Sequence, residues 1–179
     1  VLIIAFLFLT LALSIGYFFI DVIRIRVDGW LNPWNDPSGS SFQIVQSVLA
    51  VANGGLIGRG PGLGSPLLVP VAVSDFIYAA IAEETGLIGT LGLLALIWLI
   101  LARGLIASLR APDRFRRFLG AGVVTYLGIQ SLLIIGGNLR LLPLTGVTLP
   151  FVSYGGSSLL TSFIALFILL VISNVEDSE

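Results

Sequence analysis

The sequence contains no cysteine, no histidine and no lysine. Without cysteine the chain can form no disulfide and can use no thiolate, and without cysteine and histidine it lacks the usual ligands of structural zinc. The same absences exclude a Ser-His or Cys-His catalytic pair, and with it the rhomboid type of intramembrane protease. Any acid–base chemistry in this chain must therefore depend on aspartate, glutamate, tyrosine or arginine.

Charged residues of either sign are also scarce. They make up 11% of the 179 residues, against about 25% in a soluble domain, whereas 56% of the residues are hydrophobic. The formal net charge is −1, and the sequence has no basic face of the kind that binds nucleic acid. The composition predicts an all-α polytopic membrane protein with no nucleic-acid partner.

Long apolar runs predict four transmembrane helices within a single membrane domain. The predicted spans are residues 1–23, 76–108, 118–136 and 157–173. The predicted connections and tail are residues 24–75, 109–117, 137–156 and 174–179. Within the first connection, residues 41–52 are apolar but too short to span, which predicts a short helix that lies on or dips into the membrane. No charged n-region precedes the first run, so we expect no signal peptide and interpret the chain as the C-terminal part of a longer membrane protein.

The placement of arginine predicts the orientation of the chain. Five of the nine arginines lie in or beside residues 109–117, and the positive-inside rule places that connection in the cytoplasm. The two connections rich in glycine and proline then face outside, and the C-terminus is cytoplasmic. Arg24 and Arg26 lie at the outer end of the first span, against this bias. We expect them to snorkel to lipid headgroups, with a functional role as the alternative.

Three carboxylates lie at the start of the second span, in VSDFIYAAIAEETG, residues 73–86. Ser74 or Asp75 is placed to act as the N-cap of the helix. On a continuous helix, Asp75 and Glu83 are roughly 12 Å apart along the axis, wider than the roughly 5 to 9.5 Å between the carboxylates of glycosidases. A single general base therefore fits better than a hydrolytic pair. Glu83 and Glu84 point about 100° apart, so at least one should face a polar cavity or a cation.

A glycine run follows in NGGLIGRGPGLG, residues 53–64, which contains six glycines. Backbone amides in such a run can approach an anion closely, and Arg59 adds a fixed positive charge. A diphosphate would suit this place, and a flexible loop is the alternative interpretation.

A second irregular segment is LLPLTGVTLPFVSYGGSSLL, residues 141–160. Pro143 and Pro150 break the helix, and small polar residues then lead into the last span. Non-helical backbone at membrane depth needs protein or a water-filled cavity around it, so the segment predicts a cavity, with a tight outer turn as the alternative. Gln130 lies in mid-span, where we expect it to hydrogen-bond a neighbouring helix.

Four motifs in this order resemble the SEDS family, the membrane glycosyltransferases of peptidoglycan synthesis that include FtsW, RodA and SpoVE. The motifs are LNPWNDPSGSSFQIVQS, GGLIGRGPGLG, SDFIYAAIAEETGLIG and LLPLTGVTLPFVSYGGSSLL. The resemblance covers about residues 24–172. It implies a fold of about ten membrane helices, of which this chain resembles the last four with the large outer loop that precedes the eighth.

The resemblance implies a peptidoglycan glycosyltransferase that polymerises lipid II with inversion, in cell division or elongation, in the bacterial plasma (inner) membrane. Asp75 stands where the family has the aspartate tied to activity, and it would deprotonate the 4-hydroxyl of the acceptor sugar. Undecaprenyl diphosphate would leave, assisted by Arg59 and by a divalent cation, Mg²⁺ or Mn²⁺, for which no ligand is assigned. Glu83 would orient an arginine, a metal or the substrate.

Other substrate contacts are expected from polar and glycine residues of the family motifs. They are Gln46, Ser153, Gly155, Gly156 and Ser157. The partner that the resemblance implies is a class B penicillin-binding protein transpeptidase, and the piece alone is expected to be inactive. A lipid-linked precursor flippase or other transporter is an alternative, because transporters also use intramembrane polar groups and broken helices. A non-catalytic scaffold of a cell-wall synthase is the other alternative.

Overall fold

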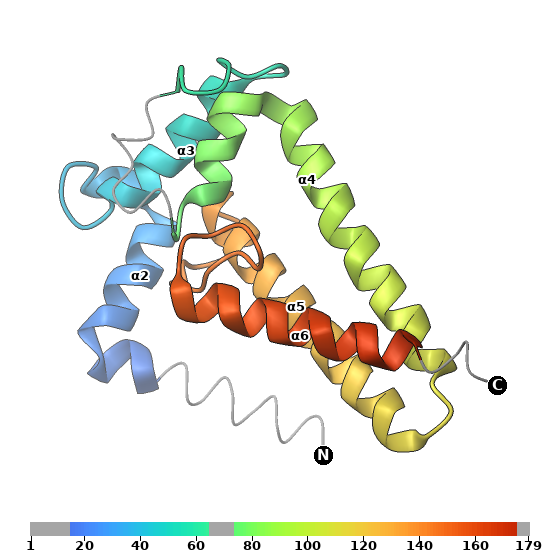
Figure 1. Ribbon diagram of the computed structural model, residues 1–179. Helices are drawn as coiled ribbons and strands as arrows, with labels where there is room; N and C mark the ends of the chain where they lie inside the picture. Colours follow the sequence, from blue (N-terminus) through green and yellow to red (C-terminus); the bar gives the residue numbers. More distant parts are fainter. Residues whose placement is uncertain (1–14, 65–73, 175–179) are drawn as a thin grey trace.

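The computed structural model describes residues 15–64 and 74–174, and every regular element in those ranges is a helix (Figure 1). The elements are α2 (Asp21–Leu31), the short 3-10 helix η1 (Pro33–Asn35), α3 (Phe42–Gly54), α4 (Ile77–Arg110), α5 (Arg114–Asn138) and α6 (Gly156–Asn174). Helices α4, α5 and α6 are long and apolar enough to cross a membrane. The predicted all-α polytopic class is therefore confirmed. Most of the first predicted span, residues 1–14, lies outside the described residues.

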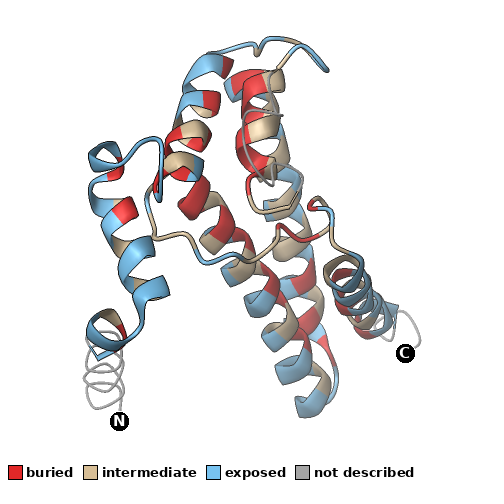
Figure 2. Ribbon diagram, turned by 90° about the vertical axis from the view of Figure 1, so that its left-hand side faces the viewer, coloured by how far each residue is buried: buried red, intermediate tan, exposed pale blue. Residues whose placement is uncertain are grey.

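The three long helices present apolar side chains outward and pack through small residues. In Figure 2 the buried positions lie where these helices face one another, and the outward faces are largely exposed. Gly104 of α4 lies against Val124 of α5 and Leu169 of α6, and a Cβ at Gly104 would stand 2.9 Å from the Val124 side chain. Close approach at small residues is typical of helices that associate in lipid. The exposed Trp98 and Phe167 suit a hydrocarbon environment better than water.

The segment before α4 is more helical than the sequence analysis expected. The helical residues 15–19 end at Ile20, whose φ of −122° and ψ of 103° are extended, so the predicted first span does not continue unbroken to residue 23. Residues 24–31, predicted as loop, belong to α2. The short helix predicted at 41–52 is present as α3, and its depth in the bilayer stays a prediction.

Helix α4 is two helical segments joined at Gly86, whose φ of 67° and ψ of −165° are not helical. Figure 1 shows the chain changing direction sharply at this point. The second segment, residues 87–110, measures roughly 36 Å at 1.5 Å per residue, enough for a hydrocarbon core of about 30 Å. The single continuous helix predicted at 76–108 is therefore corrected to two segments that meet at Gly86, and the depth of each segment in the bilayer stays a prediction. Asp75, Glu83 and Glu84 precede the break.

The glycine-rich loop, residues 53–64, supplies the backbone partners that the break in α4 would otherwise leave without bonds. The amides of Arg59 and Gly60 donate to the carbonyls of Glu83 and Glu84, both at 2.9 Å. In return, the amide of Leu87 donates to the carbonyl of Gly55 at 2.9 Å, and that of Ile88 to Leu56 at 3.2 Å. The prediction that backbone amides of this loop bind an anion is thus wrong for residues 58–60, because these amides donate to protein carbonyls.

Asn138, at the end of α5, caps the start of α4 from a distant part of the chain. The N-cap of α4 is Phe76 and has no side-chain capping bond, so neither Ser74 nor Asp75 caps this helix as expected. The fully buried Asn138 instead accepts a hydrogen bond through Oδ1 from the Ala79 amide at 3.1 Å. Its Nδ2 donates to the Asp75 carbonyl at 2.8 Å. One side chain therefore satisfies an orphan amide of α4 and fixes the turn before it.

We predict that Asn138→Ala destabilises the protein, because it leaves the buried Ala79 amide without its partner at a cost of about 1–3 kcal/mol. Thermal unfolding of the purified full-length protein in detergent should show a lower midpoint. Asn53→Ala is the control, since Asn53 is exposed at the end of α3. Equal midpoints for the two variants would contradict the capping role.

We also predict that Gly58→Ala is far more destabilising than Gly62→Ala. Both glycines have a positive φ, 84° and 73°, so the backbone strain of an alanine is matched. A Cβ at Gly58 would collide with the Glu84 carbonyl, whereas a Cβ at Gly62 meets nothing within 4 Å. The same unfolding measurement compares the two variants, and a similar loss in both would show that the contact with the α4 break is unimportant.

Candidate functional site

Asp75 lies in a turn whose backbone is held on both sides of the residue. The carbonyl of Ser74 accepts a hydrogen bond from Ser153 Oγ at 2.7 Å, and the carbonyl of Asp75 accepts the bond from Asn138 described above. Ser153 is 1% exposed and also accepts a bond from the Leu149 amide at 2.7 Å. The predicted site residue Ser153 is therefore brought to Asp75, where it fixes the backbone that carries the carboxylate.

The carboxylate of Asp75 is half-buried and its two oxygens have different surroundings. Oδ1 accepts a hydrogen bond from Ser74 Oγ at 3.0 Å. Oδ2 lies on the side of Gly146, where a Cβ built on the glycine would stand 3.8 Å from it. One oxygen is therefore oriented by the protein, while the other borders a space that a side chain at residue 146 would occupy.

Arg26 of α2 also approaches this glycine. A Cβ at Gly146 would stand 3.5 Å from Arg26 Nη2 and 3.6 Å from Nη1. Arg26 Nη1 donates to the Leu144 carbonyl at 3.1 Å, so the loop of residues 139–155 holds this side chain next to Asp75. The Arg26 side chain is also exposed, and the expectation that it snorkels to lipid headgroups stays a prediction. The sequence feature that pointed to the alternative, a functional role for Arg26, was its position at the outer end of a helix, against the positive-inside bias.

The end of α2 is clamped to the 139–155 loop by Trp30 and Arg140. Trp30 Nε1 donates to the Arg140 carbonyl at 3.1 Å, and Arg140 Nε donates back to the Trp30 carbonyl at 2.9 Å. Arg140 Nη2 also donates to the Leu31 carbonyl at 2.9 Å. Since Arg26 is one turn before Trp30 on α2, this clamp helps to set where the guanidinium of Arg26 lies.

Arg59 and Glu83 form an ion pair at the other end of the first segment of α4. Arg59 Nη1 lies 3.4 Å from Glu83 Oε1, and the Glu83 side chain is 3% exposed while that of Arg59 is 44% exposed. Glu83 thus faces a cation, in line with the sequence analysis. The pair is about two turns along the helix from Asp75, given 3.6 residues per turn. The charge of Arg59 is therefore matched by a buried carboxylate at a distance from the Asp75 turn.

The remaining predicted site residues have no hydrogen bond to Asp75 in the described part of the structure. Gln46 is half-buried on α3, next to Ser47, whose Oγ donates to the Asn138 carbonyl at 3.0 Å. Gly155, Gly156 and Ser157 stand at the start of α6, with the last two exposed.

Gln130 binds the 139–155 loop and not a neighbouring helix, which corrects the sequence expectation. Its Nε2 donates to the Thr148 carbonyl at 2.8 Å. Thr148 Oγ1 in turn hydrogen-bonds Ser158 Oγ of α6. The loop is therefore tied to α5 and to α6 as well as to α2.

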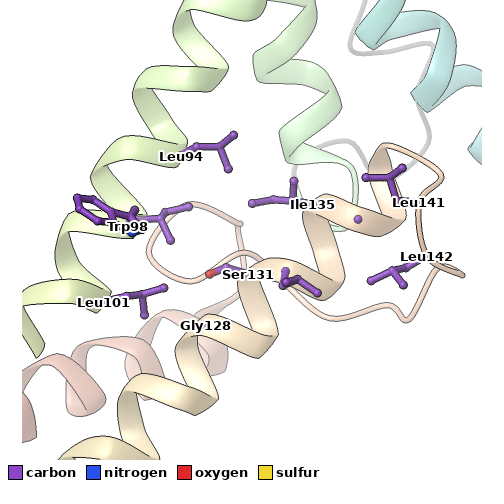
Figure 3. A pocket seen from close by; sticks show the side chains of 11 residues that line it. Leu94, Trp98, Leu101, Gly128, Ser131, Ile135, Leu141 and Leu142 are labelled. Carbon is purple, nitrogen blue, oxygen red and sulfur yellow. The ribbon is translucent and has the colours of Figure 1, made fainter. Parts of the chain in front are cut away.

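An apolar cavity of about 520 Å³ lies between the spanning segment of α4, α5 and the first residues of the 139–155 loop (Figure 3). Leu94, Trp98, Leu101 and Ile135 contribute to its wall. Ser131 also lines the cavity, and its hydroxyl donates to the Leu127 carbonyl of the same helix at 2.8 Å. The cavity provides no acid or base, so the chemistry of the molecule does not belong here.

A metal site would need several ligands close together. Within the residues that the structure describes, no group of three or more Asp, Glu, His or Cys residues comes together to hold an ion. The divalent cation that the sequence analysis considered therefore has no ligand set in these ranges. We derive no step that depends on it.

Comparison with known proteins identifies related chains. The model of the FtsW/RodA/SpoVE family, described as cell cycle proteins, matches residues 1–178. The chain is 46% identical over 160 residues to a protein named peptidoglycan glycosyltransferase RodA from Mycobacterium bovis, which covers 89% of this chain and 34% of that protein. It is also 46% identical over 156 residues to a probable peptidoglycan glycosyltransferase FtsW from Geobacter metallireducens, covering 86% and 42%.

A solved structure has the same fold. It comes from work on the coordination of polymerization and crosslinking by a peptidoglycan synthase complex, with a TM-score of 0.76 and 28% identity, covering 99% of this chain and 50% of that chain. The chain therefore spans half or less of the length of the proteins it resembles. The resemblance found in the sequence motifs is confirmed, and the chain belongs to the FtsW/RodA/SpoVE family, a family of multi-pass membrane proteins.

Proposed function

We propose that this chain is the C-terminal part of an inverting peptidoglycan glycosyltransferase that polymerises lipid II into glycan strands. The observation that carries the proposal is the Asp75 carboxylate, which is held in a fixed turn with Oδ2 bordering the space at Gly146. The names of the relatives from Mycobacterium and Geobacter give the same activity for those proteins. A single positioned base is what a sugar hydroxyl needs to become a nucleophile.

The reaction that this site supports has one proton transfer and one displacement. Asp75 Oδ2 accepts the proton of the acceptor 4-hydroxyl while that oxygen bonds to the anomeric carbon of the lipid-linked donor. The bond from the anomeric carbon to the diphosphate oxygen breaks, and undecaprenyl diphosphate leaves with the electron pair. The α linkage becomes β, and Asp75 later returns its proton to water. Fixing the base in advance avoids the entropic cost of orienting it during the reaction.

We assign supporting roles to the other candidate residues from their neighbours. Ser153 holds the backbone of the turn, and the Arg59–Glu83 pair holds the 53–64 loop against the α4 break. Gln46 adjoins Ser47, which bonds Asn138. We propose that Gln46 contacts the glycan from α3, and that Gly155, Gly156 and Ser157, which follow Ser153 closely in the chain, contact it from the start of α6.

The membrane setting and the partner complete the proposal. Three apolar helices support an inner-membrane location, with the Asp75 turn outside and the C-terminus in the cytoplasm. The partner we propose is a class B penicillin-binding protein transpeptidase, supported by the solved relative, whose description joins polymerization with crosslinking. The break in α4 gives no support to a transporter, because its free backbone groups bond to residues 55–60 instead of lining a path for a substrate.

We predict that Asp75→Asn in the full-length protein abolishes polymerisation. Asparagine keeps the size of the side chain but cannot accept the proton, and loss of a general base typically costs about 10²–10⁴-fold in rate. Glycan chain formation from purified lipid II measures the effect. Asp113→Asn is the matched control, since Asp113 caps α5 and asparagine caps a helix equally well.

Each outcome has a distinct meaning. Polymer from wild type and from Asp113→Asn, with none from Asp75→Asn, supports the enzyme. Equal polymer from all three proteins overturns the role of Asp75. Transport of lipid II across vesicles without polymer would replace the proposal with a transporter. Neither activity, together with retained binding of the transpeptidase, would replace it with a scaffold.

A further inference from the structure

We propose that Arg26 binds the diphosphate of the lipid-linked glycosyl donor, next to Asp75 at the open position beside Gly146. The inference rests on the proposed function and deepens it, because it names the group that stabilises the leaving diphosphate. Arg59 was expected to have this role, and the geometry points to a different arginine.

The Arg26 guanidinium carries five N–H donors, of which one bonds the neutral carbonyl of Leu144. The residue is exposed, and Nη2 is the guanidinium nitrogen closest to the open position at Gly146. A planar guanidinium with free donors matches phosphate oxygens in a two-point contact. Arg26 therefore has both the charge and the unused donors that a diphosphate requires.

The other arginines before and after the Asp75 turn already have charged or backbone partners. Arg24 pairs with Asp28 at 3.7 Å, and Arg59 pairs with Glu83 at 3.4 Å. Arg140 uses Nε and Nη2 to bind the backbone of α2. In the described part of the chain Arg26 has no ion pair within 4.0 Å, so its charge is not neutralised by direct contact. It is the arginine of this region that is best able to accept an anion.

Arg26 and Asp75 both approach the open position at Gly146. A Cβ at Gly146 would stand 3.8 Å from Asp75 Oδ2 and 3.5 Å from Arg26 Nη2. The proposed base and the cation therefore border the same open position, so a reacting centre placed there lies within reach of both a base for the nucleophile and a stabiliser for the leaving group.

Two features require a glycine at residue 146. Its φ of 71° is in the left-handed region, which residues with side chains rarely adopt. A side chain there would also be in van der Waals contact with both Arg26 and Asp75. Glycine keeps open the space in which we place the reacting centre.

The test uses the full-length protein with purified lipid II and follows rate and substrate dependence. Arg26→Gln should lower the turnover rate by roughly 10²–10³-fold, as loss of one preorganised donor to a developing anion does. Arg26→Lys should recover part of the rate, because it restores the charge without the two-point contact. Arg24→Gln is the matched control on the same helix and should stay within about twofold of wild type, because Arg24 is exposed and paired with Asp28.

A second readout does not depend on turnover. Binding of undecaprenyl diphosphate is measured in the Asp75→Asn background, with and without Arg26→Gln and Arg24→Gln. We expect Arg26→Gln to weaken binding by at least about tenfold and Arg24→Gln to leave it unchanged, a loss in the range of a charge-assisted hydrogen bond. Unchanged affinity in the Arg26→Gln protein overturns the inference, whatever the activity assay gives.

The two readouts also separate this inference from the proposed function. If wild type polymerises and Asp75→Asn does not, while Arg26→Gln keeps full rate and full affinity, only the role of Arg26 is wrong. If wild type forms no polymer but Arg26→Gln still weakens diphosphate binding, the proposed reaction is wrong and the binding role of Arg26 stands.

Discussion

The hydrogen bonds of the Asn138 side chain are the interaction on which the site depends. A helix that begins beside the membrane leaves amides in its first turn that water cannot easily reach, and each unpaired group is costly. Asn138 satisfies one of these in α4, at Ala79, and binds the Asp75 carbonyl with the same amide group. Because Asn138 is fully buried and is itself bonded by Ser47, the turn before α4 has little freedom. The position of the carboxylate follows from a requirement to satisfy backbone groups.

The same requirement explains the break at Gly86. A change of direction in a helix frees carbonyls before the break and amides after it. The 53–64 loop bonds both sets, through Arg59 and Gly60 on one side and Gly55 and Leu56 on the other. Such pairing needs backbone against backbone, which only glycine permits at Gly58 and Gly86. The glycine run is therefore a structural partner of α4, and Asp75, Glu83 and Glu84 all precede the break.

The sequence predicted α5 and α6 closely, because hydrophobic length alone determines a span: 118–136 and 157–173 compare with Arg114–Asn138 and Gly156–Asn174. It could not predict the cap of α4. The rules for helix N-caps consider only neighbouring residues such as Ser74 and Asp75, whereas the residue that caps α4, Asn138, is 63 residues away from Asp75. It could not predict the contact between Arg26 and the 139–155 loop, because a residue's position near a helix end says nothing about a loop that arrives from another part of the chain. Asp75 itself was selected by resemblance to a family, and local physics alone favoured a cap.

Asp75 and Arg26 come from segments that are far apart in the chain, and the 139–155 loop contacts both. It supplies the Leu144 carbonyl to Arg26, Ser153 to the Asp75 turn, and the open position at Gly146 that both side chains border. Arg140, at the start of this loop, has a φ of 57°, a conformation that costs about 1–2 kcal/mol in a residue other than glycine. Its bonds to the end of α2 offset that strain. Strain that persists only because the surrounding structure determines it is typical of functional sites. The backbone path of this loop, more than any one of its side chains, therefore sets the positions of the Asp75 carboxylate and the Arg26 guanidinium, the groups to which we assign the proposed base and cation.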